Sequence, residues 1–390
     1  MKERKINSSR MPVYRDSGFQ LFDAGTTSGV FKNETEHQRE PDLYIYSRYR
    51  NPTVVAAEEE VMKVEKCNWA LLTQTGMSAI DIAVSVFQEA QNPRPWLFFT
   101  EIYGGTISFI ESVLKRRRGI DVHSFSPENG TYDLKKFEEL LIKLKPAFVY
   151  AETVSNPLLV VTDIPSVIKL AKKHGARVII DNTFATPLLY RPLEDGADIV
   201  IHSATKYFSG HGNLTAGVLC GNDQELMKQA IEYRKFVGHM LSPDEAYRLT
   251  TQIKTLRLRF DKQCENASRL AQWLSSNGAI EKVFFPGLQS HETHRQAVSL
   301  FGEKQFGAMI TVDFAGRTSD EKRDKRDRFI SLVAEKIKLI PTLGDPETII
   351  MPVESVWGAK YPEPGMLRIS VGFEEYQDLF DTVSGAVARL

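Results

Sequence analysis

Cysteine is scarce in this chain, which has three cysteines among its 390 residues. Cys67, Cys220 and Cys264 are odd in number and lie far apart, so they fit neither a disulfide framework nor a Cys-x-x-Cys metal site. So few cysteines, so widely spaced, are typical of a protein from a reducing compartment. We therefore expect a cytoplasmic protein.

Long apolar runs are also missing. No stretch of about 18 apolar residues, the length that spans a bilayer, occurs anywhere in the chain. The first ten residues are polar and charged, without the apolar centre of a signal peptide. These absences predict a protein that is neither secreted nor embedded in a membrane.

The chain has no excess of charge of either sign. Its 49 basic and 50 acidic residues leave a net charge of -1, so no overall field favours nucleic acid or an anionic membrane. His291 and His294 are three residues apart, whereas a zinc protease places its two histidines four apart on one helical face. We expect a small substrate, no metal site and no nucleic-acid partner.

Apolar residues are plentiful, at 42% of the composition, and the length suggests two or three domains around a large core. Residues 1–60 have few periodic apolar positions and many polar and aromatic ones, which predicts an extended N-terminal arm. Residues 61–250 alternate short apolar runs with helix-like segments, which is typical of a large α/β domain. Residues 251–390 combine long amphipathic helices with spaced strands and predict a smaller α+β domain.

Several short apolar runs in the α/β region have the composition of buried strands. Continuous runs of this kind occur where helices cover both faces of a sheet. Their alternation with helix-like segments predicts a mostly parallel sheet with crossover helices. The runs are residues 96–99, 147–150, 178–180 and 199–201.

Two charged residues follow neighbouring predicted strands. Asp181 comes directly after residues 178–180, and Lys206 follows residues 199–201 within a short stretch of small and hydroxyl residues. An α/β sheet binds ligands beyond the carboxyl ends of its strands, so the two side chains should converge. Pyridoxal 5'-phosphate (PLP) needs this pair, because a lysine amine forms its Schiff base and an acid keeps its pyridine nitrogen protonated.

A phosphate site is predicted at a second strand end. Residues 75–78 follow the apolar run 70–72 and open an apolar helix, so the free backbone N–H groups of Gly76 and Met77 could bind a phosphate. The hydroxyls of Ser203 and Thr205 would add donors. Each residue alone could be an ordinary helix cap, turn or surface residue, and only the combination indicates the cofactor.

The order of these motifs resembles that of the Cys/Met-metabolism PLP enzymes. This family has the type I (aspartate aminotransferase-like) PLP-dependent transferase fold and includes cystathionine and methionine γ-lyases, cystathionine γ-synthase and O-acetylhomoserine sulfhydrylase. The resemblance extends over nearly the whole chain. It rests on residues 46–53, 75–77, 103–106, 152–157, 181–183, 203–207, 241–243 and 367–372.

The resemblance implies a role for each residue of the active centre. Lys206 would hold the cofactor, Asp181 would pair with its pyridine nitrogen, and Tyr103 would stack on its ring and act as a general acid or base. Asn156 would contact the cofactor's phenolic oxygen and the substrate. Arg368 would bind the substrate carboxylate with its planar fork of donors.

The resemblance also implies how the subunits assemble. Gly76, Met77, Ser203 and Thr205 would hold the phosphate from their own subunit. Tyr46 and Arg48 would reach the phosphate of a neighbouring subunit, with Tyr46 also near the substrate. The expected assembly is a homotetramer, built as a dimer of dimers with shared active sites.

One region departs from the family pattern. Where members carry a His-Pro pair, this chain has Met351 and Pro352, and the segment from there to Arg368 is short and unusual, with Trp357 inside it. Thr348 keeps a hydroxyl at a position expected near the substrate. The departures lie where a substrate side chain is expected, so they leave the exact substrate open.

Three classes of function are consistent with these residues. The first is a lyase that performs β- or γ-elimination on a sulfur-type or homoserine-derived amino acid and releases a 2-oxo acid and ammonia. The second is a γ-replacement synthase that joins a homoserine ester to a thiol. The third is a non-catalytic binding or structural protein that retains only the fold, and the presence of both Lys206 and Asp181 argues against it. We favour the lyase, because no feature is evident that would retain a second substrate.

Overall fold

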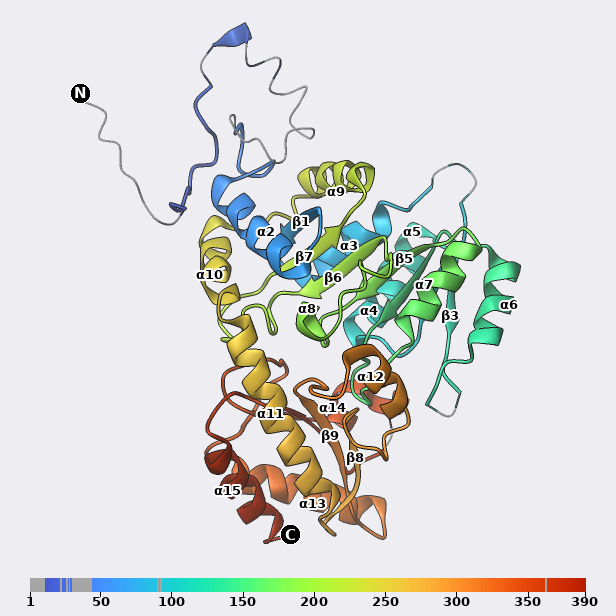
Figure 1. The fold of residues 1–390 in the computed structure, drawn as a ribbon, viewed down its shortest axis with the longest axis vertical. Helices are drawn as coiled ribbons and strands as arrows, with labels where there is room; N and C mark the ends of the chain where they lie inside the picture. The colour runs from blue at the N-terminus through green and yellow to red at the C-terminus, as the bar shows by residue number, and fades with distance from the viewer. Residues whose placement is uncertain are drawn as a thin grey trace, which may run out of the picture.

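The structure is a computed structural model that describes residues 11–21, 23–25, 27, 29, 44–89, 91, 93–128, 130–361 and 363–390. Parts of the predicted arm therefore lie outside the described residues. Figure 1 shows a large sheet with helices around it in the upper part and a smaller sheet with its own helices below. The long helix α11 (Leu256–Ser275) runs from one part to the other.

The large sheet has seven strands in the order β1-β7-β6-β5-β4-β2-β3. Neighbouring strands are parallel, except that β7 is antiparallel to both β1 and β6. The predicted mostly parallel sheet and its four predicted strands are confirmed. The strands are β1 (Trp69–Thr73), β2 (Trp96–Phe99), β3 (Val122–Phe125), β4 (Phe148–Glu152), β5 (Arg177–Asp181), β6 (Ile199–Ser203) and β7 (Gly217–Gly221).

The central strands of this sheet are buried on both faces. Val149, Ile179 and Val200 each have no exposed surface, which explains why their strands consist of continuous apolar runs. The helices of this part are α2 (Pro52–Glu65), α3 (Gly76–Ser85), α4 (Gly104–Phe109), α5 (Arg116–Arg118), α6 (Leu134–Leu144), α7 (Ile164–Lys173), α8 (Thr186–Leu189), α9 (Gln224–Val237) and α10 (Pro243–Ile253). A π-helical turn, η1 (Ile110–Lys115), joins α4 to α5.

Local sequence signals fix several of these helix ends. Asn51 caps α2 by accepting a hydrogen bond from the backbone N–H of Thr53, and Pro52 occupies the first helical position. Thr75 caps α3 in the same way through Ser78 N–H. The basic run that ends with α5 stops at Gly119, whose φ of 65° is left-handed. Basic residues at a helix C-terminus suit the helix dipole.

The smaller sheet has five strands in the order β10-β11-β12-β9-β8, and all its pairs are antiparallel except β10 with β11. Its strands are β8 (Ile280–Phe284), β9 (Met309–Phe314), β10 (Lys338–Leu339), β11 (Ile349–Pro352) and β12 (Met366–Ser370). Its helices are α12 (His294–Phe301), α13 (Ser319–Val333), α14 (Val353–Trp357), the 3-10 turn η2 (Gly358–Lys360) and α15 (Tyr376–Val387).

Helix α11 packs against two hydrophobic cores. Phe260 and Cys264, in its first half, belong to the core of the large sheet. Ala267 and Leu270, further along, belong to the core of the smaller sheet. The division into residues 1–60, 61–250 and 251–390 stays a prediction, because one continuous helix serves both cores. Among the described residues, no helix is long and apolar enough to span a membrane.

Candidate active site

A cavity of about 210 Å³ lies where β4, β5 and β6 end and helix α3 begins. Segments around Thr342 and Arg368 line its other side. They belong to the part of the structure built on the five-stranded sheet, called the small-sheet part below, as opposed to the large-sheet part built on the seven-stranded sheet. The cavity brings together most of the residues predicted from the sequence. These are Gly76, Met77, Tyr103, Asn156, Asp181, Ser203, Thr205, Lys206 and Arg368.

Lys206 presents its amine to this cavity from the turn that follows β6. Its Nζ donates a hydrogen bond to Thr342 Oγ1 at 2.9 Å. Burial lowers the pKa of Lys206 to about 8, with repulsion from the Arg368 cation acting in the same direction and Asp345 opposing it. A substantial fraction of this amine is therefore neutral near pH 8, which suits a nucleophile or a base.

Asp181 ends β5 with its carboxylate held in a defined orientation. Its Oδ1 accepts hydrogen bonds from the N–H of Thr183 at 3.0 Å and from its hydroxyl at 2.6 Å, while Oδ2 accepts from Tyr150 at 3.3 Å. Burial raises the pKa of Asp181, and the Thr183 hydrogen bonds limit the rise. A cation next to this carboxylate would stabilise its ionised form.

The start of helix α3 lies beside Ser203. A β-carbon at Gly76 would come 3.0 Å from the Ser203 β-carbon, so glycine is what allows this close approach. The first N–H groups of a helix have no partner within it and can bind an anion. Thr205 Oγ1 is fixed by two hydrogen bonds with the backbone of Ala216. Helix terminus and hydroxyls thus form one wall of the cavity.

Tyr103 stands at the start of α4 with 49% of its surface exposed. A β-carbon at Gly105 would overlap the Tyr103 ring, so this glycine lets the ring fold back over the helix. The Tyr103 N–H donates to Glu152 Oε1 at 2.5 Å. Burial raises the pKa of Glu152 well above its usual value, and the charge of Asp181 adds to the rise.

Arg368, on β12, keeps donors free for a ligand. Its Nη2 donates to the carbonyl of Thr342 at 2.7 Å and its Nη1 reaches Asn156 Oδ1 at 3.5 Å. Its buried Nε has no hydrogen-bond partner among the described residues. Burial lowers the pKa of Arg368 to about 10. An incoming carboxylate would supply the missing counter-charge and acceptor.

Three predicted residues lie outside the lining of this cavity. Tyr46 is on the arm, and Arg48 Nη1 donates to the carbonyl of Lys235 at 2.5 Å. Thr348 is buried, and its hydroxyl accepts from Gly372 N–H at 3.0 Å. Thr342, which contacts both Lys206 and Arg368, was missed by sequence reasoning. Only its nearness along the chain to Thr348, which was expected near the substrate, could have indicated it.

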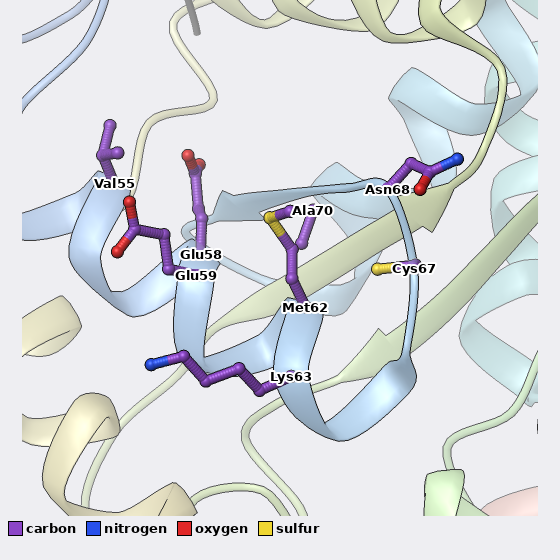
Figure 2. A pocket seen from close by; sticks show the side chains of 8 residues that line it. All are labelled: Val55, Glu58, Glu59, Met62, Lys63, Cys67, Asn68 and Ala70. Atoms are coloured by element: carbon purple, nitrogen blue, oxygen red, sulfur yellow. The ribbon is translucent and has the colours of Figure 1, made fainter. Parts of the chain in front are cut away.

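A second, wider cavity of about 490 Å³ lies beside α2 and β1. Figure 2 shows Met62 pointing toward Ala70, with the amine of Lys63 directed away from Cys67. Two of its charged side chains form ion pairs with residues outside the lining, since Glu58 pairs with Arg234 and Lys63 pairs with Glu60. No catalytic grouping follows from this cavity.

Comparisons with known proteins show which proteins this chain resembles. The chain is 33% identical to L-methionine γ-lyase of Porphyromonas gingivalis, covering 94% of this chain and 90% of that protein. It is 31% identical to cystathionine β-lyase of Coxiella burnetii, with 92% of each covered. The crystal structure of cystathionine γ-synthase from Xanthomonas oryzae pv. oryzae, in complex with aminoacrylate and cysteine, superposes with a TM-score of 0.83. That protein is 27% identical to this chain over 97% of this chain and 92% of its own.

The family description "Cys/Met metabolism PLP-dependent enzyme" matches residues 1–388. The resemblance and the PLP-dependent transferase fold predicted from the sequence are thereby confirmed. The named relatives are lyases or synthases that act on sulfur amino acids. The chain therefore belongs to the family of Cys/Met metabolism PLP-dependent enzymes, and pyridoxal phosphate is its cofactor.

Proposed function

We propose that this enzyme is a lyase that catalyses β- or γ-elimination on a sulfur-type or homoserine-derived amino acid. The products would be a 2-oxo acid, ammonia and the leaving group. The observation that carries the proposal is the convergence of Lys206, Asp181 and Arg368 in one cavity. An amine, a buried carboxylate and a guanidinium with free donors are the groups needed to hold the cofactor and an amino-acid substrate.

The residues of the cavity fit pyridoxal phosphate. Lys206 would bind its aldehyde carbon, and Asp181 would face the pyridine nitrogen, whose positive charge would offset the burial of the carboxylate. The N–H groups of Gly76 and Met77 with the hydroxyls of Ser203 and Thr205 would bind the phosphate. The close approach of Gly76 to Ser203 supports this, because it joins the two halves of the phosphate site.

The bound cofactor supplies an electron sink for negative charge at the substrate α-carbon. Lys206 would remove the α-proton onto Nζ, and its pKa of about 8 keeps part of its population neutral and ready to accept it. For a γ-leaving group, a second proton must leave Cβ. Tyr103 would donate its phenolic proton to the departing sulfur or oxygen, and its exposed ring at the cavity supports that role.

Substrate orientation would depend on the small-sheet side of the cavity. Arg368 would take the α-carboxylate with the donors that remain free beside Asn156 and Thr342. Asn156 would also contact the phenolic oxygen of the cofactor. Met351 and Trp357 would shape the leaving-group pocket, because Met351 lies opposite Arg368 in the β11–β12 register and Trp357 lies beside its guanidinium group. Thr348 would act only from outside the cavity lining, through its contact with Gly372.

The active site would be completed by a neighbouring subunit in a homotetramer. Tyr46 and Arg48 lie on the arm, outside the lining of their own cavity, which supports their use in another subunit. Arg48 lies over the ring of Tyr49 at 4.9 Å and bonds the Lys235 carbonyl, so the arm is held against α9. The cytoplasmic location stays a prediction from the sequence.

A γ-replacement synthase is the second candidate, favoured by the structural similarity to cystathionine γ-synthase. Assaying 2-oxo acid release from cystathionine, methionine and O-acylhomoserine, with and without an added thiol, separates the two. A lyase releases 2-oxo acid without the thiol. If product formed only from the homoserine ester together with a thiol, the enzyme would be a synthase. Borohydride reduction followed by peptide mapping should locate the cofactor on Lys206.

A further inference from the structure

The loop that carries Tyr103 belongs to the large-sheet part and is contacted by residues of the small-sheet part. Residues 100–103 connect β2 to α4 in the large-sheet part. Tyr361, which precedes β12 in the small-sheet part, donates its hydroxyl to Glu101 Oε2 at 2.5 Å. Lys360 donates to the carbonyl of Thr100 at 2.7 Å and lies 3.3 Å from Glu101 Oε1. These contacts join residues about 260 positions apart.

The contact between Tyr361 and Glu101 is well shielded from water. Tyr361 is 6% exposed and Glu101 is 9% exposed. The Tyr361 ring packs with Phe284, Val353 and Met366, so its position does not depend on the hydroxyl alone. Burial raises the pKa of Tyr361, and the nearby Glu101 charge raises it further, so the phenol stays a hydrogen-bond donor. A buried hydrogen bond to a carboxylate is among the stronger kinds.

The large-sheet part holds the same loop at two other points. The Glu101 N–H donates to the Tyr132 hydroxyl at 3.2 Å, and the Tyr103 N–H donates to Glu152. The loop is thus fixed along its length, with Tyr103 at its end. Moving Glu101 would move Tyr103, because only Ile102 separates them and a short loop has little freedom.

The segment that supplies Lys360 and Tyr361 also reaches Arg368. The Trp357 ring lies 5.6 Å from the Arg368 guanidinium carbon. This is the short segment after Pro352 that departs from the family pattern. It therefore contacts Arg368 through Trp357, and it contacts the loop that carries Tyr103 through Glu101 and Thr100.

We propose that Tyr361 and Lys360 are positioning residues that hold Tyr103 over the cavity through Glu101 and Thr100. This inference rests on the proposed function, in which Tyr103 delivers a proton to the leaving group. The small-sheet part thereby controls the geometry of an acid that belongs to the large-sheet part. Correct placement of Tyr103 requires the two parts to be docked.

The test uses Tyr361→Phe, which keeps the packed ring and removes only the hydroxyl. Turnover number should fall about tenfold while KM stays nearly unchanged. This is the size expected when the loop that positions the acid loses one hydrogen bond to a charged group. Amide hydrogen–deuterium exchange of residues 100–106, measured without cofactor, should become faster. Lys360→Met should show a smaller change of the same kind. Tyr190→Phe is the matched control, because it removes a 2.6 Å hydrogen bond to Asp195 outside the cavity.

A double variant tells positioning from general destabilisation. If Tyr361 acts through Tyr103, adding Tyr361→Phe to Tyr103→Phe should cause no further loss of turnover. Additive losses, or unchanged exchange of residues 100–106 in Tyr361→Phe, would overturn the inference while leaving the proposed function intact. Unchanged turnover in Tyr103→Phe alone would overturn the proposed role of Tyr103 itself, and the inference with it.

Discussion

The amine of Lys206 and the hydroxyl of Thr342 lie 2.9 Å apart, and the Thr342 carbonyl accepts a hydrogen bond from Arg368. One residue from the small-sheet part therefore holds both cations of the candidate active site. The two positive charges repel each other, and this repulsion contributes to the lowered pKa of Lys206. Binding of the cofactor at Lys206 and of a substrate carboxylate at Arg368 would reduce this repulsion.

The first prediction concerns the pH dependence of apoprotein stability. The folded-state pKa of Lys206 is about 8, below its ordinary value of 10.5, so the folded protein disfavours the charged amine. Lys206→Met should therefore raise the free energy of unfolding by roughly 3 kcal/mol below pH 8. This advantage should decline between pH 8 and 10.5, as the wild-type amine becomes neutral in the folded state.

Denaturant unfolding of both apoproteins at pH 7 and pH 10 measures this difference. Both proteins contain the same other titrating groups, so the contributions of those groups cancel in the difference. If the stability advantage of Lys206→Met grew with pH, the charged Lys206 amine would be stabilised, rather than destabilised, by its surroundings.

The second prediction is that Asp181→Asn lowers turnover far more than cofactor occupancy. The amide keeps the shape and can still accept from Thr183, whereas the charge facing the cofactor is lost. We expect a loss of about 10²-fold or more, the scale observed when one preorganised electrostatic group is removed. Turnover and the cofactor content of purified protein provide the two measurements. Wild-type turnover would make Asp181 a structural residue.

Much of this site could be predicted because strand ends have a clear sequence signature. Asp181 directly follows an apolar run that is buried on both faces, and Lys206 follows another after four intervening residues. Parallel strands bring such ends to one edge of the sheet. Contacts across the two parts leave no such signature. The pairing of Tyr361 with Glu101 joins residues 260 apart. Thr348 carried the expected hydroxyl, but its partner Gly372 depends on how the small sheet packs.

The third prediction tests whether subunits share active sites. Arg48→Ala and Lys206→Ala should each be inactive as pure proteins, because each lacks one group of every site. Mixing them under conditions of subunit exchange should restore part of the activity, since some hybrid sites receive a full set of groups. Activity assays with mass spectrometry of the exchanged oligomers provide the measurement. Proven exchange without recovered activity would show that Tyr46 and Arg48 serve their own subunit or none.

The last prediction separates carboxylate binding from side-chain selection at two residues that face each other across β11 and β12. Met351 pairs with Arg368 in the antiparallel strand register, so their side chains leave the same face of the sheet. Arg368→Lys loses the planar fork of donors. It should lower kcat/KM for every amino-acid substrate by an amount equivalent to roughly 1.5 to 3 kcal/mol, the worth of a charge-assisted hydrogen bond.

Met351→His introduces the histidine that family members carry in place of the apolar methionine. It should change the preference among substrate side chains while substrates still bind. Measuring kcat/KM for cystathionine, methionine and O-acylhomoserine with both variants decides the roles. If Arg368→Lys affected a single substrate and Met351→His weakened all three equally, the roles would have to be exchanged.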